Sequence, residues 1–341
     1  KEPSIYYIVY EYMNEKLGIE CGRASVNIID SFIRGKEVDI AAILNDLKKT
    51  AVESEMGPST RAIYVEAKKR GIPVLRLGND SLIQLGYGKY SRLIEASLTD
   101  ATSCVSVDIA GNKQLTKQIL RDNDIPVPYG DIAYTEQSAI ALAEYIGYPV
   151  VVKPYDGNQG KGVALNLSSR EQVRVAHFEA IKFSKAVIVE KYVKGKDYRV
   201  LVVGEKVSAV SERKPPCVIG DGIHTIKELV EAENNNDLRG DDHEKPLTKI
   251  HLDSVARLSL SRRGLDENYI PAPSEEVYLR DNGNLSTGGT ARDCSREIHP
   301  YNACLAVKAA KLIGLDIAGI DITAEDISVP ICNGSGAIIE V

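Results

Sequence analysis

The sequence has 341 residues, of which 43% are apolar, so it can bury a sizeable core and we expect two or three domains or subdomains. A net charge of -6 argues against broad nucleic-acid binding and favours a small molecule or peptide as the partner. No apolar run approaches the roughly 20 residues of a membrane span, and the first residues lack a basic stretch followed by a long apolar one, so we expect a cytoplasmic protein.

The spacing of cysteine and histidine argues against several kinds of site. The six cysteines never occur as C-x-x-C, which fits reduced thiols better than a disulfide framework or a structural zinc site. The five histidines are dispersed and none forms H-E-x-x-H, so neither a nucleophilic triad nor a zinc hydrolase has support in the sequence.

Residues 1–104 are expected to form a smaller amino-terminal α/β domain. Its segments switch between alternating and helical spacing of apolar residues, with polar residues between them. The expected elements, in chain order, are a strand over 5–14, helices over 25–33, 39–51 and 59–71, and a short strand over 72–77.

Residues 105–341 are expected to form a second domain, in which strand-like and helix-like stretches again alternate, so the whole chain is predicted to be α/β or α+β. The first helix places Lys113 and Lys117 one turn apart on one face. Alternation places Asp197 and Arg199 on one face of their strand. Further helices are expected over 137–149, 168–184, 226–233 after a possible capping box of Thr225 and Glu228, 252–264 and 300–313. Strands are expected over 151–154, 163–167, 186–213 with a turn at 204–205, 315–323 and 336–341.

The stretch VVKPYDGNQGKG places a strand before a loop with Gly157, Gly160 and Gly162. Glycines let successive backbone N–H groups point into one concavity, and Lys153 and Lys161 add positive charge, so the loop suits a phosphate. The spacing matches neither the P-loop nor the dinucleotide-binding pattern, and an apolar run follows it, so we predict a hairpin whose tip covers a ligand. The alternative is a glycine-rich hairpin turn without a ligand.

Two acidic residues stand alone in apolar strands near the end of the chain. Asp321 lies in AGIDIT and Glu340 lies in AIIEV. A strand carboxylate among buried neighbours is costly unless it is paired or binds a cation, and Mg²⁺ prefers carboxylate oxygens together with phosphates. Two such strands side by side would form a magnesium site; the alternative is that both acids sit at exposed strand ends.

This combination of features, in this order, resembles the ATP-grasp ligases. The resemblance is carried by Lys113 on a helix, Lys153 before the glycine loop, the VIVEKYVKGKDYRV segment, and Asp321 and Glu340 on late strands. It implies that Lys113 and Lys153 contact the phosphates of a nucleotide, that the glycine loop closes over them, and that Asp197 contacts the ribose.

The resemblance also implies an ATP-grasp fold over residues 105–341, with a nucleotide lid over about 149–195 and an inserted segment over about 214–280. The implied cofactors are ATP and Mg²⁺, with Asp321 and Glu340 as the metal ligands. The residues implied at the nucleotide are Lys113, Lys153, Asp156, Gly157, Gly160, Lys161 and Gly162, the adenine hinge Glu190, Lys191, Tyr192 and Val193, and Asp197.

A closer resemblance is to the cyanophycin-forming branch of this family. It rests on KPYDGNQGKGV, DYRVLVVGEKV, VIGDGIHTIKELV, HEKPLT, VYLRDNGNLSTGGTA and GLDIAGIDI, and on residues 57–90 of the first domain. It implies a ligase that activates the C-terminal carboxylate of a poly-aspartate (cyanophycin) primer as an acyl phosphate and adds aspartate. We expect a homo-oligomer without nucleic-acid or membrane partners.

Two departures from that branch lead us to expect a fragment. The metal site of the family adds an asparagine two residues after the glutamate, whereas this sequence ends at Val341. The Mur-ligase-like domain of that branch, with its own P-loop, is not in this sequence.

The implied chemistry needs no general-base histidine, because the site has to neutralise ATP, align two anions and exclude water from an acyl phosphate. Arg199, Arg213 and Arg280 are the candidates for contacts to the acyl phosphate and carboxylate, each with a surface salt bridge as the alternative. In NLSTGGTA a turn alone would need one glycine, so the hydroxyl and backbone donors there are candidates for a substrate carboxylate. Those residues are Ser286, Thr287, Gly288 and Gly289.

Two other functions stay open. One is a peptide ligase of the glutathione-synthetase type, because such ATP-grasp enzymes have segments similar to GDG-T-x-x-EL and STGG; DGNQGKG and the first domain favour the polymer-forming branch. The other is a non-catalytic, nucleotide-responsive module that binds peptides. That function would call for a degraded set of lysines or acids, whereas both lysines and both acids are present.

Overall fold

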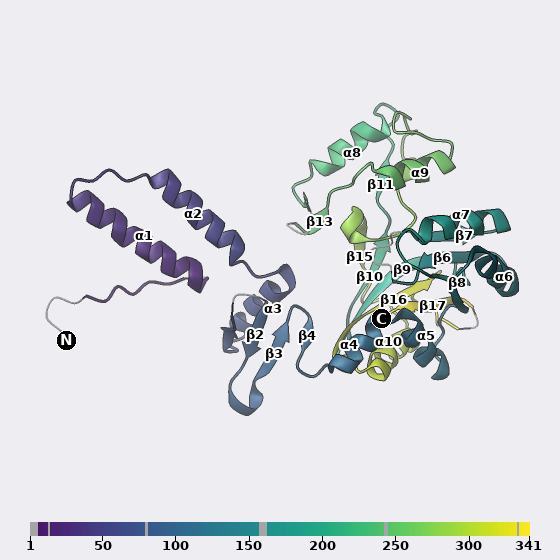
Figure 1. Ribbon diagram of the computed structural model, residues 1–341, viewed down its shortest axis with the longest axis horizontal. Helices are drawn as coiled ribbons and strands as arrows, with labels where there is room; N and C mark the ends of the chain where they lie inside the picture. The colour runs from purple at the N-terminus through teal and green to yellow at the C-terminus, as the bar shows by residue number, and fades with distance from the viewer. Residues whose placement is uncertain (1–5, 13, 79–80, 157–161, 242–244, 333) are drawn as a thin grey trace. The chain divides into compact units, whose positions relative to one another are not determined.

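The computed structural model describes residues 6–12, 14–78, 81–156, 162–241, 245–332 and 334–341. The chain divides into two compact units, Lys1–Asp100 and Ala101–Val341 (Figure 1). Gly157, Gly160 and Lys161, which we predict at the nucleotide, lie outside the described residues.

The first unit contains long helices and a small antiparallel sheet. Asn14 and Asp39 cap the first two helices, because each side chain accepts a hydrogen bond from a backbone N–H of the first turn. The expected helices and the expected strand over 72–77 are confirmed. The elements are α1 (Glu15–Ile33), α2 (Ile40–Glu53), α3 (Pro58–Lys69), β1 (Val74–Arg76), β2 (Leu82–Leu85), η1 (Gly88–Tyr90), β3 (Arg92–Glu95) and β4 (Leu98–Thr99), with the sheet order β1-β2-β3-β4.

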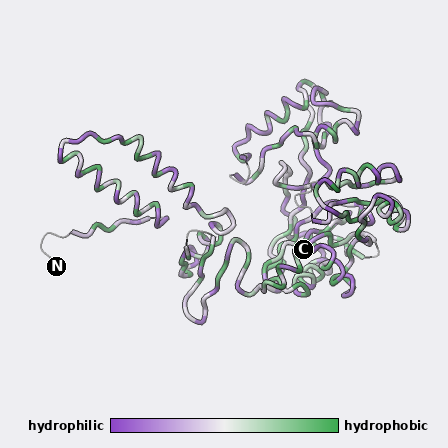
Figure 2. The backbone as a smooth tube through the Cα atoms, in the orientation of Figure 1, coloured by the Kyte–Doolittle hydropathy of each residue, from purple (hydrophilic) through white to green (hydrophobic). Residues whose placement is uncertain are grey.

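Residues 6–12 do not form the strand that their alternation predicts. A strand needs a partner for its backbone, which alternation alone does not supply, and Tyr6 and Val9 are 90% and 94% exposed. Hydrophobic and hydrophilic residues alternate along α1 and α2 (Figure 2), but apolar side chains such as Ile29 and Phe32 are largely exposed. These two helices therefore bury little of their apolar surface within the unit.

Among the described residues, the two largest sheets of the second unit are both antiparallel, and the smaller of the two has four strands. Helices α6 (Glu136–Ile146) and α7 (Arg170–Ala180) pack against this sheet around a core that includes Ala139, Val150 and Val173. Its strand order is β5 (Gly130–Ala133), β8 (Val187–Lys191), β6 (Val150–Pro154) and β7 (Ala164–Leu167). The antiparallel pairing of β6 with β7 confirms the strand-loop-strand unit around the glycine loop.

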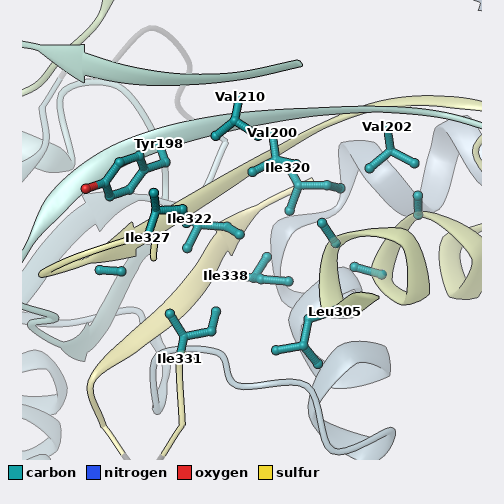
Figure 3. Packing of buried hydrophobic residues seen from close by; sticks show 14 of the residues in the cluster. Tyr198, Val200, Val202, Val210, Leu305, Ile320, Ile322, Ile327, Ile331 and Ile338 are labelled. Carbon is teal, nitrogen blue, oxygen red and sulfur yellow. The ribbon is translucent and has the colours of Figure 1, made fainter. Parts of the chain in front are cut away.

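The larger sheet has five strands and a separate core. Val200, Ile320 and Ile338 on the strands and Leu305 on α10 (Pro300–Ile313) belong to this core (Figure 3). Helices α4 (Cys104–Gly111) and α5 (Lys113–Asp122) pack against α10. The strand order is β15 (Thr290–Asp293), β10 (Lys206–Lys214), β9 (Lys196–Val203), β16 (Ile317–Ala324) and β17 (Gly336–Glu340), so the expected helix over 300–313 and the strands with Asp321 and Glu340 are confirmed.

The segment between β10 and β15 has a third core, with Ile226, Leu260 and Leu279 among its members. The capping box of Thr225 and Glu228 is confirmed at the start of α8. The elements of this segment are β11 (Cys217–Ile219), α8 (Ile226–Asn234), β12 (Arg239–Gly240), β13 (Leu247–Thr248), α9 (Ser254–Arg262), β14 (Glu276–Tyr278) and η2 (Leu285–Thr287). None of the helices in the described ranges has the length and apolarity needed to cross a membrane.

Candidate functional site

Three charged side chains meet where α5 approaches the four-stranded sheet. Lys153 on β6 donates a hydrogen bond from Nζ to Glu190 Oε1 on β8, over 2.6 Å. Lys117 on α5 donates to the other oxygen of the same carboxylate, Glu190 Oε2. The side chains of Lys117, Lys153 and Glu190 are only 5%, 11% and 4% exposed, so the strand end at Lys153 is not a surface position.

The pKa values in this cluster follow from burial and from the sharing of one carboxylate. Burial alone would raise the pKa of Glu190, but the charges of Lys153 and Lys117 outweigh burial and hold that pKa below its ordinary value. Burial, together with the charge of Lys153, lowers the pKa of Lys117 to about 8. Burial also opposes the charged form of Lys153, but Glu190 outweighs it and the pKa of Lys153 is raised.

The close approach of β5 fixes the backbone at Glu190. Gly130 on β5 lies opposite Glu190 in the register of the two strands. A Cβ at position 130 would lie 2.6 Å from the Cα and from the Cβ of Glu190, so only glycine fits there. Gly130 therefore lets β5 pack tightly behind the carboxylate that holds the two lysines.

The two ends of the glycine loop are described, and both are anchored. Asp156 donates from its backbone N–H to Ser184 Oγ over 3.3 Å, and Ser184 Oγ donates to Asp156 Oδ2 over 3.1 Å. Gly162 has φ +69°, and a Cβ there would press against Phe183 and Pro154. The loop therefore begins and ends at fixed positions beside β6.

The expected adenine hinge connects β8 to β9. The backbone N–H of Lys191 donates to Tyr129 O over 2.7 Å, and that of Tyr192 donates to Pro149 O over 3.1 Å. The side chain of Lys191 donates to Gly147 O and Tyr148 O. These contacts hold the start of the hinge in place. A contact with adenine stays a prediction for the hinge carbonyl groups and for Val193.

Asp321 lies at the centre of a second cluster, on the five-stranded sheet. On β16 it is opposite Glu340 of β17 on one side and opposite Arg199 of β9 on the other. Arg199 Nη1 is 2.9 Å from Asp321 Oδ2, and Arg213 Nη1 is 4.0 Å from Asp321 Oδ1. Lys113 Nζ is 3.8 Å from Glu340 Oε1. The structure thus brings together both predicted metal ligands, one predicted phosphate lysine and two predicted arginines.

The two carboxylates of this cluster fit a hard divalent cation. Burial raises the pKa of Asp321 against the opposing charges of Arg199 and Arg213, and the charge of Glu340 adds to the rise. Asp321 Oδ1 is buried and has no hydrogen-bond partner among the described residues, so a cation would satisfy it. Across the described ranges no group of three His, Cys, Asp or Glu side chains is placed to hold a metal, so water or phosphate would complete the shell.

Room for the guanidinium of Arg199 comes from Gly319. This glycine precedes Asp321 by two residues, on the same face of β16. A Cβ at position 319 would overlap Nε, Cζ and Nη2 of Arg199. The guanidinium therefore lies over the bare backbone of Gly319 and reaches Asp321 from there.

Asp197 lies on β9 two residues before Arg199, as alternation predicts. Thr323 Oγ1 donates to Asp197 Oδ1 over 2.9 Å. Burial raises the pKa of Asp197, while the bonds from Thr323 and from the backbone of Gly283 and the charge of Arg213 oppose the rise. Its contact with a ribose stays a prediction.

Arg280 is separated in its contacts from the other two predicted arginines. Its Nη2 donates to Asp253 Oδ2, and Asp253 is the residue that caps α9 by accepting from the backbone N–H groups of Val255 and Ala256. The side chain of Arg280 is 13% exposed, whereas that of Asp253 is 44% exposed, so the pair joins a largely buried arginine to a carboxylate that solvent reaches. This contact supports a structural role for Arg280 at the start of α9, and its contact with the acyl phosphate or the carboxylate stays a prediction.

The NLSTGGTA loop has steric reasons for both of its glycines, so the expectation that a turn would need only one is wrong. Gly288 has φ +94° and a Cβ there would lie 2.7 Å from Ile250 Cγ1, while a Cβ on Gly289 would lie 2.8 Å from Lys214 O. The four backbone N–H groups from Ser286 to Gly289 donate within the loop. The backbone donors expected for a substrate are thus used inside the turn, as is the hydroxyl of Thr287, which donates to Asn284 O.

Three residues that shape the site are not among those that the sequence predicts there. The sequence predicts Lys117 one turn from Lys113, and its spacing of three from the buried Leu120 puts it on the buried face of α5. Gly319 had no signal beyond being a glycine in a strand. Arg239, which is buried and donates to Gly288 O over 3.1 Å and Thr248 O over 2.8 Å, had no signal at all.

Comparison with known proteins gives consistent matches. Residues 110–216 match the RimK-like ATP-grasp domain. The chain is 45% identical over 343 residues to the cyanophycin synthetase of Trichormus variabilis, covering 99% of this chain and 38% of that protein. It is 42% identical to the cyanophycin synthetase of Geminocystis herdmanii, covering 99% of this chain and 40% of that protein. The chain therefore spans about two fifths of the length of these relatives.

A second group of relatives is more distant. The glutathione biosynthesis bifunctional protein GshAB of Listeria monocytogenes is 38% identical over 275 residues, covering 79% of this chain and 36% of that protein. The crystal structure of a bifunctional glutathione synthetase from Pasteurella multocida aligns with a TM-score of 0.62 and 32% identity, covering 88% of this chain and 42% of that one. The chain has an ATP-grasp fold, and over nearly its whole length it is a homologue of the cyanophycin synthetases.

Proposed function

We propose that this chain forms peptide bonds at the expense of ATP, by activating the C-terminal carboxylate of a poly-aspartate (cyanophycin) primer and adding aspartate. The observation that carries the proposal is the pairing of Asp321 with Glu340 next to Arg199, beside the buried cluster of Lys153 and Glu190. The names of the relatives at 42% and 45% identity support the choice of substrates.

The reaction joins two anions, so the site has to supply positive charge. An oxygen of the primer carboxylate attacks the γ-phosphorus of ATP, the bond to ADP breaks, and an acyl phosphate forms. The amine of aspartate then attacks the acyl carbon, phosphate leaves with the bonding electrons, and the nitrogen loses a proton. Neither step needs an oxidant or a histidine base.

The positions of the side chains support the proposed roles. Lys153 and Lys113 hold the phosphates, and Arg199 and Arg213 hold the carboxylate and the acyl phosphate through charge-assisted hydrogen bonds. Asp321 and Glu340 would hold Mg²⁺, which would supply further neutralisation of the phosphate charge. The segment of about 149–195, with its glycine loop, is the proposed nucleotide lid, and it excludes water from the acyl phosphate.

The remaining predicted contacts belong to the nucleotide and the primer. Val193 and the hinge carbonyl groups are proposed for adenine, and Asp197 for the ribose. Ser286 is proposed for the primer carboxylate through its hydroxyl group, since the backbone donors of its loop are used internally.

The experiment measures ADP release with a poly-aspartate primer, ATP and Mg²⁺, adding aspartate or arginine separately. Turnover is expected with aspartate and lost in Asp321→Asn. It has to be measured both for these 341 residues and for a protein of the full length of the relatives, which are more than twice as long as this chain. Turnover with arginine in the absence of aspartate would refute the assignment of the substrate.

Ligation of the glutathione-synthetase type is the second candidate, supported by the alignment to the Pasteurella multocida structure and by the 38% identity to GshAB. The two candidates differ in the amine and in the activated carboxylate. ADP release with γ-glutamylcysteine and glycine, compared with primer and aspartate, separates them. Turnover with the first pair alone would replace the main proposal.

A further inference from the structure

The charges of the buried cluster do not balance. Lys117 and Lys153 contribute two positive charges and Glu190 contributes one negative charge, so the three side chains together carry one excess positive charge. Each ammonium group has three N–H donors and the shared carboxylate takes one from each, so within the part of the chain that the structure describes donors are left for another acceptor. An anion is the natural acceptor at such a place.

The charged groups around the cluster do not cancel the excess. Glu340 on β17 acts on Lys153 and favours its charged form, but Glu340 is half-exposed and lies 3.8 Å from Lys113 of α5. This outer pair is neutral as a whole. A buried positive charge without a counterion is unfavourable, and a bound polyphosphate would relieve it.

We propose that Lys117 and Glu190 are positioning residues of a polyphosphate site: Glu190 holds two ammonium groups in place, and Lys117 keeps the cluster cationic so that Lys153 can bind an anion. Without Lys117, Glu190 and Lys153 would form a neutral pair. The identity of the polyphosphate as ATP rests on the proposed function.

A purely structural role for Lys117 makes a different prediction. Lys117 lies on α5, whose Leu120 belongs to the core of the five-stranded sheet, and Glu190 lies on β8 of the four-stranded sheet. The contact could therefore serve only to join these two parts. If the contact only joins the two parts, removing either Lys117 or Glu190 should have the same effect. If its role is electrostatic, the effect should depend on the summed charge of Lys117, Lys153 and Glu190.

The experiment varies that sum with neutral side chains of similar length. Lys117→Met gives a net charge of zero, Glu190→Gln gives two positive charges, and the double variant returns to one. Binding of a non-hydrolysable ATP analogue and of inorganic tripolyphosphate is measured by calorimetry, with thermal unfolding to show that each variant is folded. Lys182→Met is the matched control, because it removes a lysine from an exposed pair with Glu179 at the end of α7.

We expect Lys117→Met to weaken both ligands by about tenfold or more, and the double variant to recover most of that loss. Lys117→Arg keeps the charge and should bind within about threefold of the wild type. The inference is overturned if the double variant binds more weakly than either single variant, or if Lys117→Arg loses as much affinity as Lys117→Met. It is also overturned if Lys117→Met binds like the wild type.

The pH dependence gives a readout that a structural link would not change. In Glu190→Gln the two ammonium groups face each other without a carboxylate, so their pKa values fall and the affinity should decline as the pH rises. The decline should begin at a lower pH than in the wild type, where Glu190 supports both charges. The same pH dependence in the two proteins would count against the proposed role of Glu190.

The same experiment separates this inference from the proposed function. Tripolyphosphate affinities that follow the charge order, without ADP release from primer and aspartate, would support the polyphosphate site and refute the ligase reaction. A wild-type protein that binds neither ligand would refute both.

Discussion

Replacing Gly319 with alanine should reduce turnover while the fold survives. The new Cβ would overlap the guanidinium group of Arg199, which is the far end of a flexible side chain, so Arg199 can move aside without a shift of the backbone. What is lost is the contact of Arg199 with Asp321, and with it the position from which Arg199 would contact the substrate.

The size of the two effects differs because of exposure. The side chains of Arg199 and Asp321 are 38% and 28% exposed, so solvent screens the pair and its loss should cost about 1 kcal/mol or less of stability. A charge-assisted hydrogen bond to a substrate anion is worth about 1.5–3 kcal/mol, which corresponds to roughly 10- to 100-fold in kcat/KM. We therefore expect a small shift in Tm and a large loss of turnover.

ADP release with primer and aspartate measures the turnover, and thermal unfolding measures the stability. Gly111→Ala is the matched control, because nothing lies within 4 Å of a Cβ at that position. Gly130→Ala gives the contrast, since its Cβ would meet backbone atoms of Val189 and Glu190 and should lower Tm. The reasoning is refuted if Gly319→Ala keeps the wild-type kcat/KM while Arg199→Met loses it.

Three further predictions concern Asp321, His177 and Arg280. Because the pKa of Asp321 is raised, the affinity for Mg²⁺ should fall as the pH is lowered through that pKa. Calorimetry at about pH 5 and about pH 8 checks this. Asp321→Asn should bind Mg²⁺ weakly at both pH values. Burial lowers the pKa of His177 against the opposing charge of Glu136, so the unfolded chain takes up the proton first and stability should fall as the pH drops below about 6.5. Melting curves of the wild type and of His177→Phe test this, and an unchanged slope in the variant would contradict it. Arg280 pairs with the residue that caps α9, so Arg280→Met should lower Tm by about 2–4 °C, the effect of losing about 1 kcal/mol in a unit of this size. A loss of kcat/KM at unchanged Tm would instead support a catalytic role.

The sequence predicts those parts of the site in which one strand residue stands out from its neighbours. Asp321 and Glu340 interrupt apolar runs, and Lys153 ends one, so each is visible without a structure. Period-2 spacing also fixes which residues share a face, which places Asp197 and Arg199 correctly. The pairing of β16 with β17 brings the two acids together. This pairing joins distant parts of the sequence, and the spacing of residues within each strand does not determine it.

The parts that sequence reasoning misses depend on contacts between elements. In the sequence, Lys117 looks like any other helix lysine and Glu190 looks like a hinge residue only. Their roles become visible in the structure, where the side chain of Glu190 on β8 contacts both Lys117 on α5 and Lys153. The segment 6–12 shows the opposite error, since alternation predicts a strand where no partner strand pairs with it among the described residues. Arg280 matches the chemistry expected of a catalytic arginine, and only the structure shows that it pairs with Asp253 at the start of α9.

The four-stranded and five-stranded sheets of the second unit have cores with no described residue in common. We therefore expect each of these sheets to exchange its amide hydrogens by opening as a unit of its own, at a lower free energy than unfolding of the whole. A nucleotide that contacts Lys153 on one sheet and the Asp321 cluster on the other would couple the opening of the two sheets. Separating the sheets would then also release the ligand, which costs its binding free energy. Occupancy of the site should therefore slow the amide exchange of β6 and β8.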